Sequence, residues 1–495
     1  MNSGTGRWIT VLAIGTALLA SGSASAQNYP VTHHHYKLVD MGTLGGPNSS
    51  YGWPFGRNIN SIGTAISEAE SAIADPFAPN CLQSCLIDRG LQWKDGVSTD
   101  MGSLPGLGSF SFFFWINDRG AAVGQSTNGL IDPLTGYPET RAALWKDGKI
   151  FDLGTLGGNV SAANSINNNG DIAGAALNAI LDNDATAFGW LPPFPVATQV
   201  RAVLWHDGVM HDLGTLGTGN NAIALFVNNL GQVAGVSSTN TSADSSTGNL
   251  TQHAFFWADG KMVDVGTLGG TVSVPFSMNN LGQVIGNSNL AGDQILHAFV
   301  WDRKHGLKDL GTLPGESLAV ANWINDEGEI VGNGDFFGGG HSILWKNGKM
   351  TDLGLLPGDC GSEALVINAK SQIIGNSTPD CSSDGAAVLW ENGEAPVNLN
   401  TLITPASNVD IVFPVSLNDL GEIAADGILP NGDVHAVILI PCDDNHANVA
   451  GCDFSMVDAN STILSKSAPA KPLTFFTAKS QTHVRAHFAN RSHRF

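Results

Sequence analysis

Residues 317–356 read SLAVANWINDEGEIVGNGDFFGGGHSILWKNGKMTDLGLL. We expect four short strands here, over 317–324, 329–333, 341–345 and 350–356, because turn residues separate four apolar segments. The turns Asn325-Asp-Glu-Gly328 and Lys346-Asn-Gly-Lys349 supply the asparagine and glycine that tight hairpins need for positive φ angles. Four strands in a unit of this length are typical of one blade of a β-propeller.

Three phrases of this unit recur along the chain. The first, of the type Asp-Leu-Gly-Thr-Leu, begins at Asp40, Asp100, Asp152, Asp212, Asp264, Asp309 and Asp352, with Asn398 in the remaining copy. The second, Asn-x-x-Gly, begins at Asn60, Asn117, Asn167, Asn228, Asn279, Asn325, Asn368 and Asn418. The third is an apolar segment that ends at Trp93, Trp145, Trp205, Trp257, Trp301, Trp345 and Trp390, and its eighth copy lacks tryptophan. Repetition at this period predicts an all-β chain of repeated units.

The two ends of the repeat region complement each other. Tyr36–Leu44 matches only a fourth strand, whereas the last copy supplies three strands, over 409–417, 422–428 and 434–440. We therefore predict that the N-terminal strand completes the last blade and closes a β-propeller ring, which removes the exposed edge of an open array. This arithmetic gives eight blades, and a seven-bladed ring is the alternative if one divergent unit lies outside it.

The N-terminus and the charge indicate where the protein works. Arg7, an apolar run over 8–20 and Ala24-Ser25-Ala26 form a signal peptide over residues 1–26, so we expect an exported protein that is secreted, periplasmic or on the cell surface. No later stretch is apolar enough for a transmembrane helix, and we expect a soluble monomer. The net charge of −21 disfavours nucleic acid and anionic lipid as partners.

The mature chain divides into a propeller over 27–442 and a C-terminal extension over 443–495. From about Ser461 to Phe495 the extension contains six Lys or Arg, three His and no Asp or Glu, and it has no repeat phrase. This composition predicts a disordered tail, and the alternative is a basic arm that contacts the acidic body or an anionic polymer.

Six cysteines in an exported protein indicate disulfides rather than catalytic thiols. Proximity in sequence suggests three pairs: Cys81 with Cys85, Cys360 with Cys381, and Cys442 with Cys452. Six cysteines allow fifteen connectivities, so this pairing is a hypothesis. Their spacing matches no zinc site.

The repeat phrases resemble the extracellular HAF-repeat family, named for a His-Ala-Phe triplet that occurs here at His253-Ala-Phe255 and His297-Ala-Phe299. The resemblance covers roughly residues 36–440. It implies an exported repeat protein, and it implies no particular activity, catalytic residue or cofactor. Arg89, Arg141 and Arg201 replace the histidine in early copies, so the histidine is not a fixed ligand.

Residues that recur in every copy are expected to stabilise the blades, and function is expected where the copies differ. The repeated aspartates are therefore interpreted as turn residues and the tryptophans as core. The copies differ most between strands two and three, where the first four blades have long connections, over 67–88, 126–140, 177–199 and 237–251. In the third of these, Phe188, Trp190 and Phe194 form a candidate ligand platform. The alternative is that these rings pack on a neighbouring blade.

Two further aromatic residues and two polar runs are weaker candidates. Trp115 and Trp323 end innermost strands and could line the channel or belong to the core. The run His33-His34-His35 could bind a transition metal, but nothing in the sequence fixes its geometry. The loop Asn325–Gly328 lacks the alternating ligands of a calcium loop. We therefore expect no cofactor.

The sequence contains no nucleophile elbow, phosphate loop or zinc-protease motif. The favoured hypothesis is a non-catalytic propeller that binds carbohydrate, peptide or a surface protein through the long connections. The alternative is a hydrolase or lyase that acts on a polymer at the same face. Paired carboxylates could serve that chemistry, and Asp132, Asp182, Asp184 and Asp244 lie in the long connections.

Overall fold

The computed structural model describes residues 32–52, 56–76, 85–106, 109–182, 188, 195–241, 251–335, 339–379, 381, 385–403 and 407–458. The predicted signal peptide and the segment 461–495 lie outside this part of the chain. Within it the regular structure is almost entirely β, with two short 3-10 helices, η2 (Leu399–Thr401) and η3 (Asp444–His446). No helix in the described residues is long and apolar enough to cross a membrane.

The strands form four-stranded units in which successive strands pair antiparallel. Units 1 to 4 consist of β3 (Gly45–Ser50), β4 (Ala65–Ala74), β5 (Leu86–Lys94) and β6 (Val97–Asp100); β7 (Ser111–Ile116), β8 (Ala122–Ile131), β9 (Pro138–Lys146) and β10 (Lys149–Asp152); β11 (Gly157–Ile166), β12 (Ile172–Leu181), β13 (Thr198–His206) and β14 (Val209–Asp212); and β15 (Ala222–Val227), β16 (Val233–Ser238), β17 (Gln252–Ala258) and β18 (Lys261–Gly266).

Units 5 to 8 repeat the same order. They consist of β19 (Gly269–Met278), β20 (Val284–Leu290), β21 (Leu296–Asp302) and β22 (Gly306–Asp309); β23 (Val320–Ile324), β24 (Ile330–Asn333), β25 (Ser342–Lys346) and β26 (Lys349–Asp352); β27 (Gly361–Ile367), β28 (Ile373–Thr378), β29 (Ala386–Trp390) and β30 (Val397–Asn398); and β31 (Asp410–Leu417), β32 (Ile423–Ile428), β33 (Val434–Pro441) and β2 (Tyr36–Asp40).

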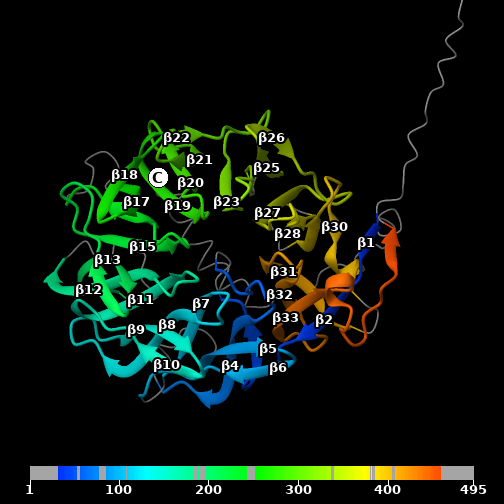
Figure 1. The fold of residues 1–495 in the computed structure, drawn as a ribbon, viewed down its shortest axis with the longest axis horizontal. Helices are drawn as coiled ribbons and strands as arrows, with labels where there is room; N and C mark the ends of the chain where they lie inside the picture. The colour runs from blue at the N-terminus through cyan, green and yellow to red at the C-terminus, as the bar shows by residue number, and fades with distance from the viewer. Residues whose placement is uncertain are drawn as a thin grey trace, which may run out of the picture.

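The units form a ring with β7, β15, β23 and β31 near its centre (Figure 1). This is the predicted all-β propeller architecture. Units 4 and 5 share one eight-stranded sheet through the parallel bridge between Gln252 and Val272, while each of the others forms its own sheet. Among the described residues, counting units gives eight and counting sheets of four or more strands gives seven, so the number of blades stays a prediction.

The N-terminal strand joins the last unit as predicted. Strand β2 pairs antiparallel with β33, from Tyr36 opposite Pro441 to Asp40 opposite Val437. It ends at Asp40 rather than at Leu44, because Asp40 accepts a hydrogen bond from the N–H of Gly42, which has a positive φ of 75° and turns the chain. The first and last described parts of the repeat region therefore share one sheet.

A cycle of asparagine side chains connects the units. The Nδ2 of each repeat asparagine donates to the backbone carbonyl of the corresponding asparagine in the next unit, over 2.8–3.2 Å, in the order Asn60, Asn117, Asn167, Asn228, Asn279, Asn325, Asn368, Asn418 and back to Asn60. Each Oδ1 accepts the backbone N–H four residues later in its own turn. The closed cycle has eight members, which favours the eight-blade interpretation.

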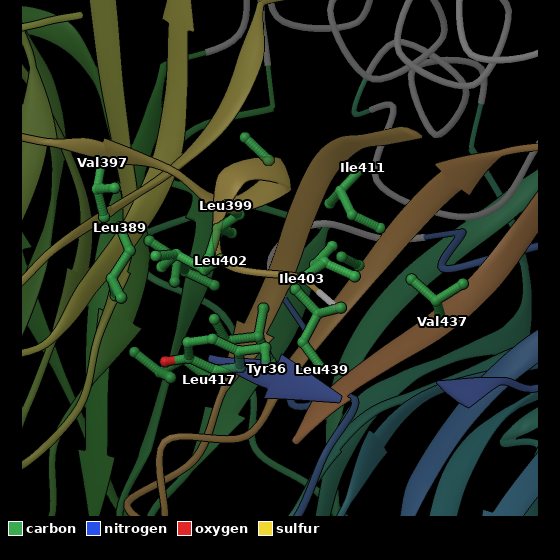
Figure 2. Packing of buried hydrophobic residues seen from close by; sticks show 14 of the residues in the cluster. Tyr36, Leu389, Val397, Leu399, Leu402, Ile403, Ile411, Leu417, Val437 and Leu439 are labelled. Atoms are coloured by element: carbon green, nitrogen blue, oxygen red, sulfur yellow. The ribbon is translucent and has the colours of Figure 1, made fainter. Parts of the chain in front are cut away.

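The hydrophobic core lies between neighbouring units. Figure 2 shows the cluster between units 7 and 8, where Leu389 and Val397 pack with Ile411, Leu439 and Tyr36. Corresponding clusters join unit 8 to unit 1 and unit 1 to unit 2. A blade with two apolar faces cannot bury both alone, so each unit depends on its two neighbours.

A glycine in the second strand allows the first strand to come close. A Cβ added to Gly124, Gly174, Gly235, Gly286, Gly332 or Gly375 would collide with a carbonyl oxygen of the first strand. The first strand carries a register shift at this point in each of these units. The glycine therefore accommodates a bulge rather than a turn.

The second and third strands are longest in units 1 to 3, where β4, β8 and β12 each contain ten residues. The sequence placed connections over 67–88, 126–140 and 177–199, but the strands continue to Ala74, Ile131 and Leu181. Much of the predicted loop is therefore extended hairpin, because backbone pairing continues beyond the buried part of each strand.

Two of the three predicted disulfides are present. Cys360 pairs with Cys381 and Cys442 pairs with Cys452, with Cα separations of 5.6 and 5.3 Å. Cys85 is also disulfide-bonded, and its predicted partner Cys81 lies outside the described residues. Beyond the second bridge, β34 (Met456–Asp458) pairs with β1 (Thr32–His34), so part of the C-terminal extension is structured against the N-terminus.

We predict that Asn418→Ala destabilises the ring by about 2 kcal/mol, because it removes one of the two hydrogen bonds of the Asn60 carbonyl and leaves the N–H of Glu422 without its partner. Urea unfolding of the purified mature protein measures the change. Asn169→Ala is the matched control, since it removes an exposed amide of the same family of turns and should change the free energy of unfolding by less than about 0.5 kcal/mol. Equal effects of the two variants would contradict a supporting role for the cycle.

Candidate functional site

The aromatic platform predicted in unit 3 is only partly described. Phe188 is fully buried and packs with Val160, Leu177, Val200 and Ile223 between units 3 and 4. Its surroundings give this ring a packing role between units, which was the alternative interpretation of these aromatic residues. Trp190 and Phe194 lie outside the described residues.

Trp115 and Trp323 meet at the centre of the ring. They come from β7 and β23, in units 2 and 6, and their rings stack with centroids 6.1 Å apart and planes 22° apart. Phe226 of unit 4 meets Trp115 edge-on at 6.1 Å. Trp115 and Trp323 therefore contact each other across the ring, two residues before the asparagine turns of units 2 and 6. Their role as ligand anchors stays a prediction.

The histidine run joins the termini to unit 7. His33 Nδ1 lies 2.6 Å from Glu391 Oε1, and His35 Nδ1 lies 3.2 Å from the carbonyl of Leu402. Burial raises the pKa of Glu391, but the hydrogen bonds with His33 and Gln372 outweigh burial and hold it below its usual value. The described residues contain no cluster of three or more His, Cys, Asp or Glu with metal-binding geometry, and Asn325 of the proposed calcium loop belongs to the asparagine cycle.

Two of the carboxylates proposed in the long connections hold hairpin ends in place. Asp132 accepts hydrogen bonds from Leu134 N, Thr135 Oγ1 and, across the unit boundary, Asn159 Nδ2. Asp182 accepts from Asn221 of unit 4. Asp184 and Asp244 lie outside the described residues.

The histidine of the HAF triplet and the aspartate of the Asp-x-Gly phrase form one repeated pair. The Arg or His side chain on the third strand contacts the carboxylate on the fourth strand, in the pairs Arg89–Asp100, Arg201–Asp212, His253–Asp264, His297–Asp309, His341–Asp352 and His435–Asp40. In unit 2 Arg141 instead contacts Glu139. In unit 7 both members change together, to Ala386 and Asn398, which a comparison of the copies could have revealed.

The pair between unit 8 and the N-terminal strand shifts both pKa values. The hydrogen bond with Asp40 raises the pKa of His435, against the opposing effect of burial. Burial raises the pKa of Asp40, but the hydrogen bonds from His435 and Gly42 outweigh it and lower the pKa below 3.8. The charged pair thus stabilises the strand that completes unit 8.

A second repeated position differs from copy to copy. Eight residues after each repeat asparagine, the second strand carries Glu68, Gln125, Ala175, Val236, Asn287, Asn333, Asn376 and Asp426. In units 5, 7 and 8 the polar side chain bonds the backbone of the next unit, at Ala321, Val412 and Tyr51. The position therefore faces the neighbouring unit, and burial raises the pKa of Asp426 to about 7 even though Tyr51 N donates to it.

In unit 1 this position belongs to a group of carboxylates on one face of the sheet. Glu68 and Glu70 are two residues apart on β4, and Asp88 lies directly opposite Glu70 on β5. The three residues are 8%, 2% and 5% exposed. Burial, and then the charges of Glu68, Glu70 and Asp75, raise the pKa of Asp88 from 3.8 to about 8. At neutral pH Asp88 is therefore protonated beside other carboxyl groups.

The acidic group has a defined frame and lies close to the surface. Asn48 donates to Glu70 Oε2 through both its backbone N and its Nδ2, over 3.0 and 2.9 Å, and Ser50 Oγ donates to Glu68 at 3.4 Å. Burial along β4 ends at Ser71, and the next three residues are exposed. This group was not predicted from the sequence, although units 1 and 8 carry an acidic residue at a position where the other copies carry Gln, Asn or an apolar residue.

No protein family and no curated protein matches the sequence. Among solved structures, the β-propeller domain of the Trilobed protease from Pyrococcus furiosus is 8% identical, with 74% of this chain and 98% of that chain covered and a TM-score of 0.40. Dipeptidyl peptidase 4 from Porphyromonas gingivalis is 10% identical, with 75% and 56% covered and a TM-score of 0.41. Oligogalacturonate lyase from Vibrio parahaemolyticus is 7% identical, with 84% and 98% covered and a TM-score of 0.36. Similarity at this level carries no argument about activity.

We predict that His435→Gln lowers the melting temperature most between about pH 4 and pH 6.5. The raised pKa of His435 gives stability that is present below its ordinary pKa and lost as the pH rises through the raised value. The lowered pKa of Asp40 gives stability that is lost only as the pH falls through that lowered value. Melting temperatures of variant and wild type across pH 3–9 test this, with exposed His211→Gln as the control; a difference independent of pH would refute it.

We predict that Asp88→Asn raises the melting temperature at pH 8 and has a much smaller effect near pH 4. Folded Asp88 keeps a proton that the unfolded chain releases above pH 3.8, so wild-type stability falls as the pH rises toward about 8, and the amide removes this slope. Asp147→Asn, at an exposed hairpin turn, is the control. Parallel pH profiles for wild type and Asp88→Asn would show that Asp88 ionises normally.

Proposed function

We propose that the protein is an exported hydrolase or lyase that acts on a polymer, with its acid–base chemistry supplied by the carboxylates of unit 1. The observation that carries this proposal is the pKa of about 8 for Asp88 beside Glu68 and Glu70. A carboxylic acid that stays protonated at neutral pH can donate a proton, and an ionised carboxylate beside it can accept one. Carboxylate pairs of this kind cleave glycosidic and peptide bonds.

Each residue has a role in this proposal. Asp88 gives its proton to the leaving oxygen or nitrogen. Glu68 or Glu70 takes a proton from the attacking water in a hydrolase, or from the carbon beside the broken bond in a lyase. Asn48 and Ser50 position the carboxylates through the hydrogen bonds that they donate. The exposed end of β4 next to Ser71 is where the polymer would approach.

A second candidate function is binding without catalysis, which was the favoured hypothesis from the sequence. It is supported by the structural use of the repeated polar groups, because the asparagine cycle and the cation–aspartate pairs occupy them. Export of the protein and its membership of the HAF-repeat family are proposed on the signal peptide and the repeat phrases, and they fit either function.

We expect the mature protein to release products from at least one substrate in an array of polysaccharides and peptides. Asp88→Asn should reduce product release by about 100-fold or more while retention on the array is kept. Wild-type activity should fall above about pH 8, as Asp88 loses its proton. Asp426→Asn is the control, since it neutralises another buried aspartate with a raised pKa, in unit 8, and should leave the activity within about twofold.

Three results would decide against the enzyme. Retention without any product release would favour the binding function. Unchanged product release by Asp88→Asn, or an equal loss of product release in Asp88→Asn and Asp426→Asn, would show that the carboxylates of unit 1 are not the catalytic centre.

A further inference from the structure

The long hairpins of units 1 to 3 end in exposed apolar residues. Their second strands finish with Ala72-Ile73-Ala74, Gly129-Leu130-Ile131 and Ala179-Ile180-Leu181. The side chains are well exposed: Ile73 54%, Leu130 58%, Ile131 45%, Ile180 57% and Leu181 69%. In unit 2 the connection adds Leu134, 54% exposed, and Tyr137, 37% exposed. We call these ends, over 72–75, 129–137 and 179–182, the hairpin tips.

Three neighbouring units thus expose large apolar side chains at the same point of the repeat. Single exposed apolar residues are ordinary, but a set that recurs on adjacent elements indicates an interaction surface. The shorter hairpins of later units do not extend this far, since β24 has four residues and β28 and β32 have six. Among the described residues, the connections of the later units expose one large apolar side chain of this kind, Ile295 of unit 5, so the set of exposed side chains is concentrated in units 1 to 3.

The hairpin tips are held by carboxylates rather than left loose. Each apolar run is followed directly by an aspartate, at Asp75, Asp132 and Asp182. Asp132 bonds Asn159 of unit 3, and Asp182 bonds Asn221 of unit 4, over 2.9 Å in both cases. The tips of units 2 and 3 therefore rest against the following unit, and the exposed side chains are presented on a fixed frame.

The charge around the hairpin tips is mainly negative. The described residues from 70 to 76, 127 to 137 and 178 to 182 contain Glu70, Asp75, Asp132 and Asp182, and no Lys, Arg or His. Next to these segments, Asp88 is protonated at neutral pH and Glu139 pairs with Arg141. The whole chain has a net charge of −21. An occupant of this surface must therefore combine apolar side chains with positive charge.

We propose that the hairpin tips of units 1 to 3 bind an extended polypeptide that carries apolar and basic side chains, and that this polypeptide is the polymer substrate. Aliphatic side chains match the Leu and Ile of the tips, and Lys or Arg side chains complement the carboxylates between them. A carbohydrate fits less well, because sugars are held by flat aromatic faces, and Tyr137 is the aromatic residue among the described tip residues.

The choice of a polypeptide rests on the proposed function and names its substrate class. Glu70 and Asp88 lie at the base of the unit 1 tip, where burial along β4 ends. A chain bound across the tips of units 2 and 3 would be directed toward these carboxylates. The bond broken would be a peptide bond, with water adding its hydroxyl to the carbonyl carbon and a proton passing to the leaving nitrogen.

The test measures binding of defined fluorescent peptides to the mature chain that carries Asp88→Asn, so that cleavage does not interfere. The probes are a 16-residue peptide of alternating Leu and Lys, the same peptide with Ser for Leu, the same peptide with Glu for Lys, and a neutral glucan oligosaccharide. Fluorescence anisotropy gives the Kd of each. We expect the Leu–Lys peptide to bind at least about tenfold more tightly than the other three probes.

The tip variant combines Leu130→Ser, Ile131→Ser and Leu134→Ser, in a hairpin whose connection is fully described. It should weaken binding of the Leu–Lys peptide by about tenfold or more. The matched control combines Leu230→Ser and Leu281→Ser, both 67% exposed, in asparagine turns at the opposite ends of the strands. It should leave the Kd within about twofold, and far-ultraviolet circular dichroism checks that both variants fold.

Each outcome bears on one proposal. Equal binding by the tip variant and the control variant, or tighter binding of the glucan than of the Leu–Lys peptide, would overturn the peptide surface and leave the acid–base group untouched. If peptide binding depends on the hairpin tips but the wild-type protein cleaves none of the peptides, the proposed binding surface would be supported and the proposed hydrolase function would be rejected.

Discussion

The cycle of asparagine amides is the constraint on which the rest of the structure depends. Each side chain closes its own turn through Oδ1 and reaches the next turn through Nδ2, so a local turn and a contact between units are made by the same group. A net contribution of about 1 kcal/mol per buried hydrogen bond is modest, but eight bonds in a closed cycle fix the relative position of every first strand. Asparagine can do this because its short side chain carries the acceptor oxygen and the donor nitrogen on separate atoms.

This arrangement explains why the repeated residues carry no chemistry of their own. Three of the repeat tryptophans, Trp205, Trp345 and Trp390, donate to leucine carbonyls of the preceding unit, at Leu153, Leu310 and Leu353. The Arg and His side chains at the first position of the triplet contact the aspartates of the fourth strand, which also accept the N–H of the glycine two residues later. Because these repeated groups stabilise the units, differences in function between the copies are expected where their sequences differ.

Unit 1 combines two features that meet at one place. Its second strand carries Glu68 where units 3 and 4 carry Ala175 and Val236, and its hairpin, like those of units 2 and 3, continues beyond the buried part of the sheet. Burial of like charges is costly, so the raised pKa of Asp88 is the expected response of the protein to this packing. Proteins keep such costly groups chiefly at functional sites, which is the physical basis for assigning the chemistry to this unit.

The sequence by itself determined the architecture, the strand that completes the last unit, and the pairs Cys360–Cys381 and Cys442–Cys452, because these depend on repeated spacing and on short separations along the chain. It also indicated that function lies in the long connections of the early units, although it took extended hairpins for loops. Only the tertiary structure decided that Phe188 is buried, that Trp115 meets Trp323, and that Asp88 lies opposite Glu70. These facts depend on contacts between units or on strand register, and the repeat period does not encode which faces meet or how deeply a side chain is buried.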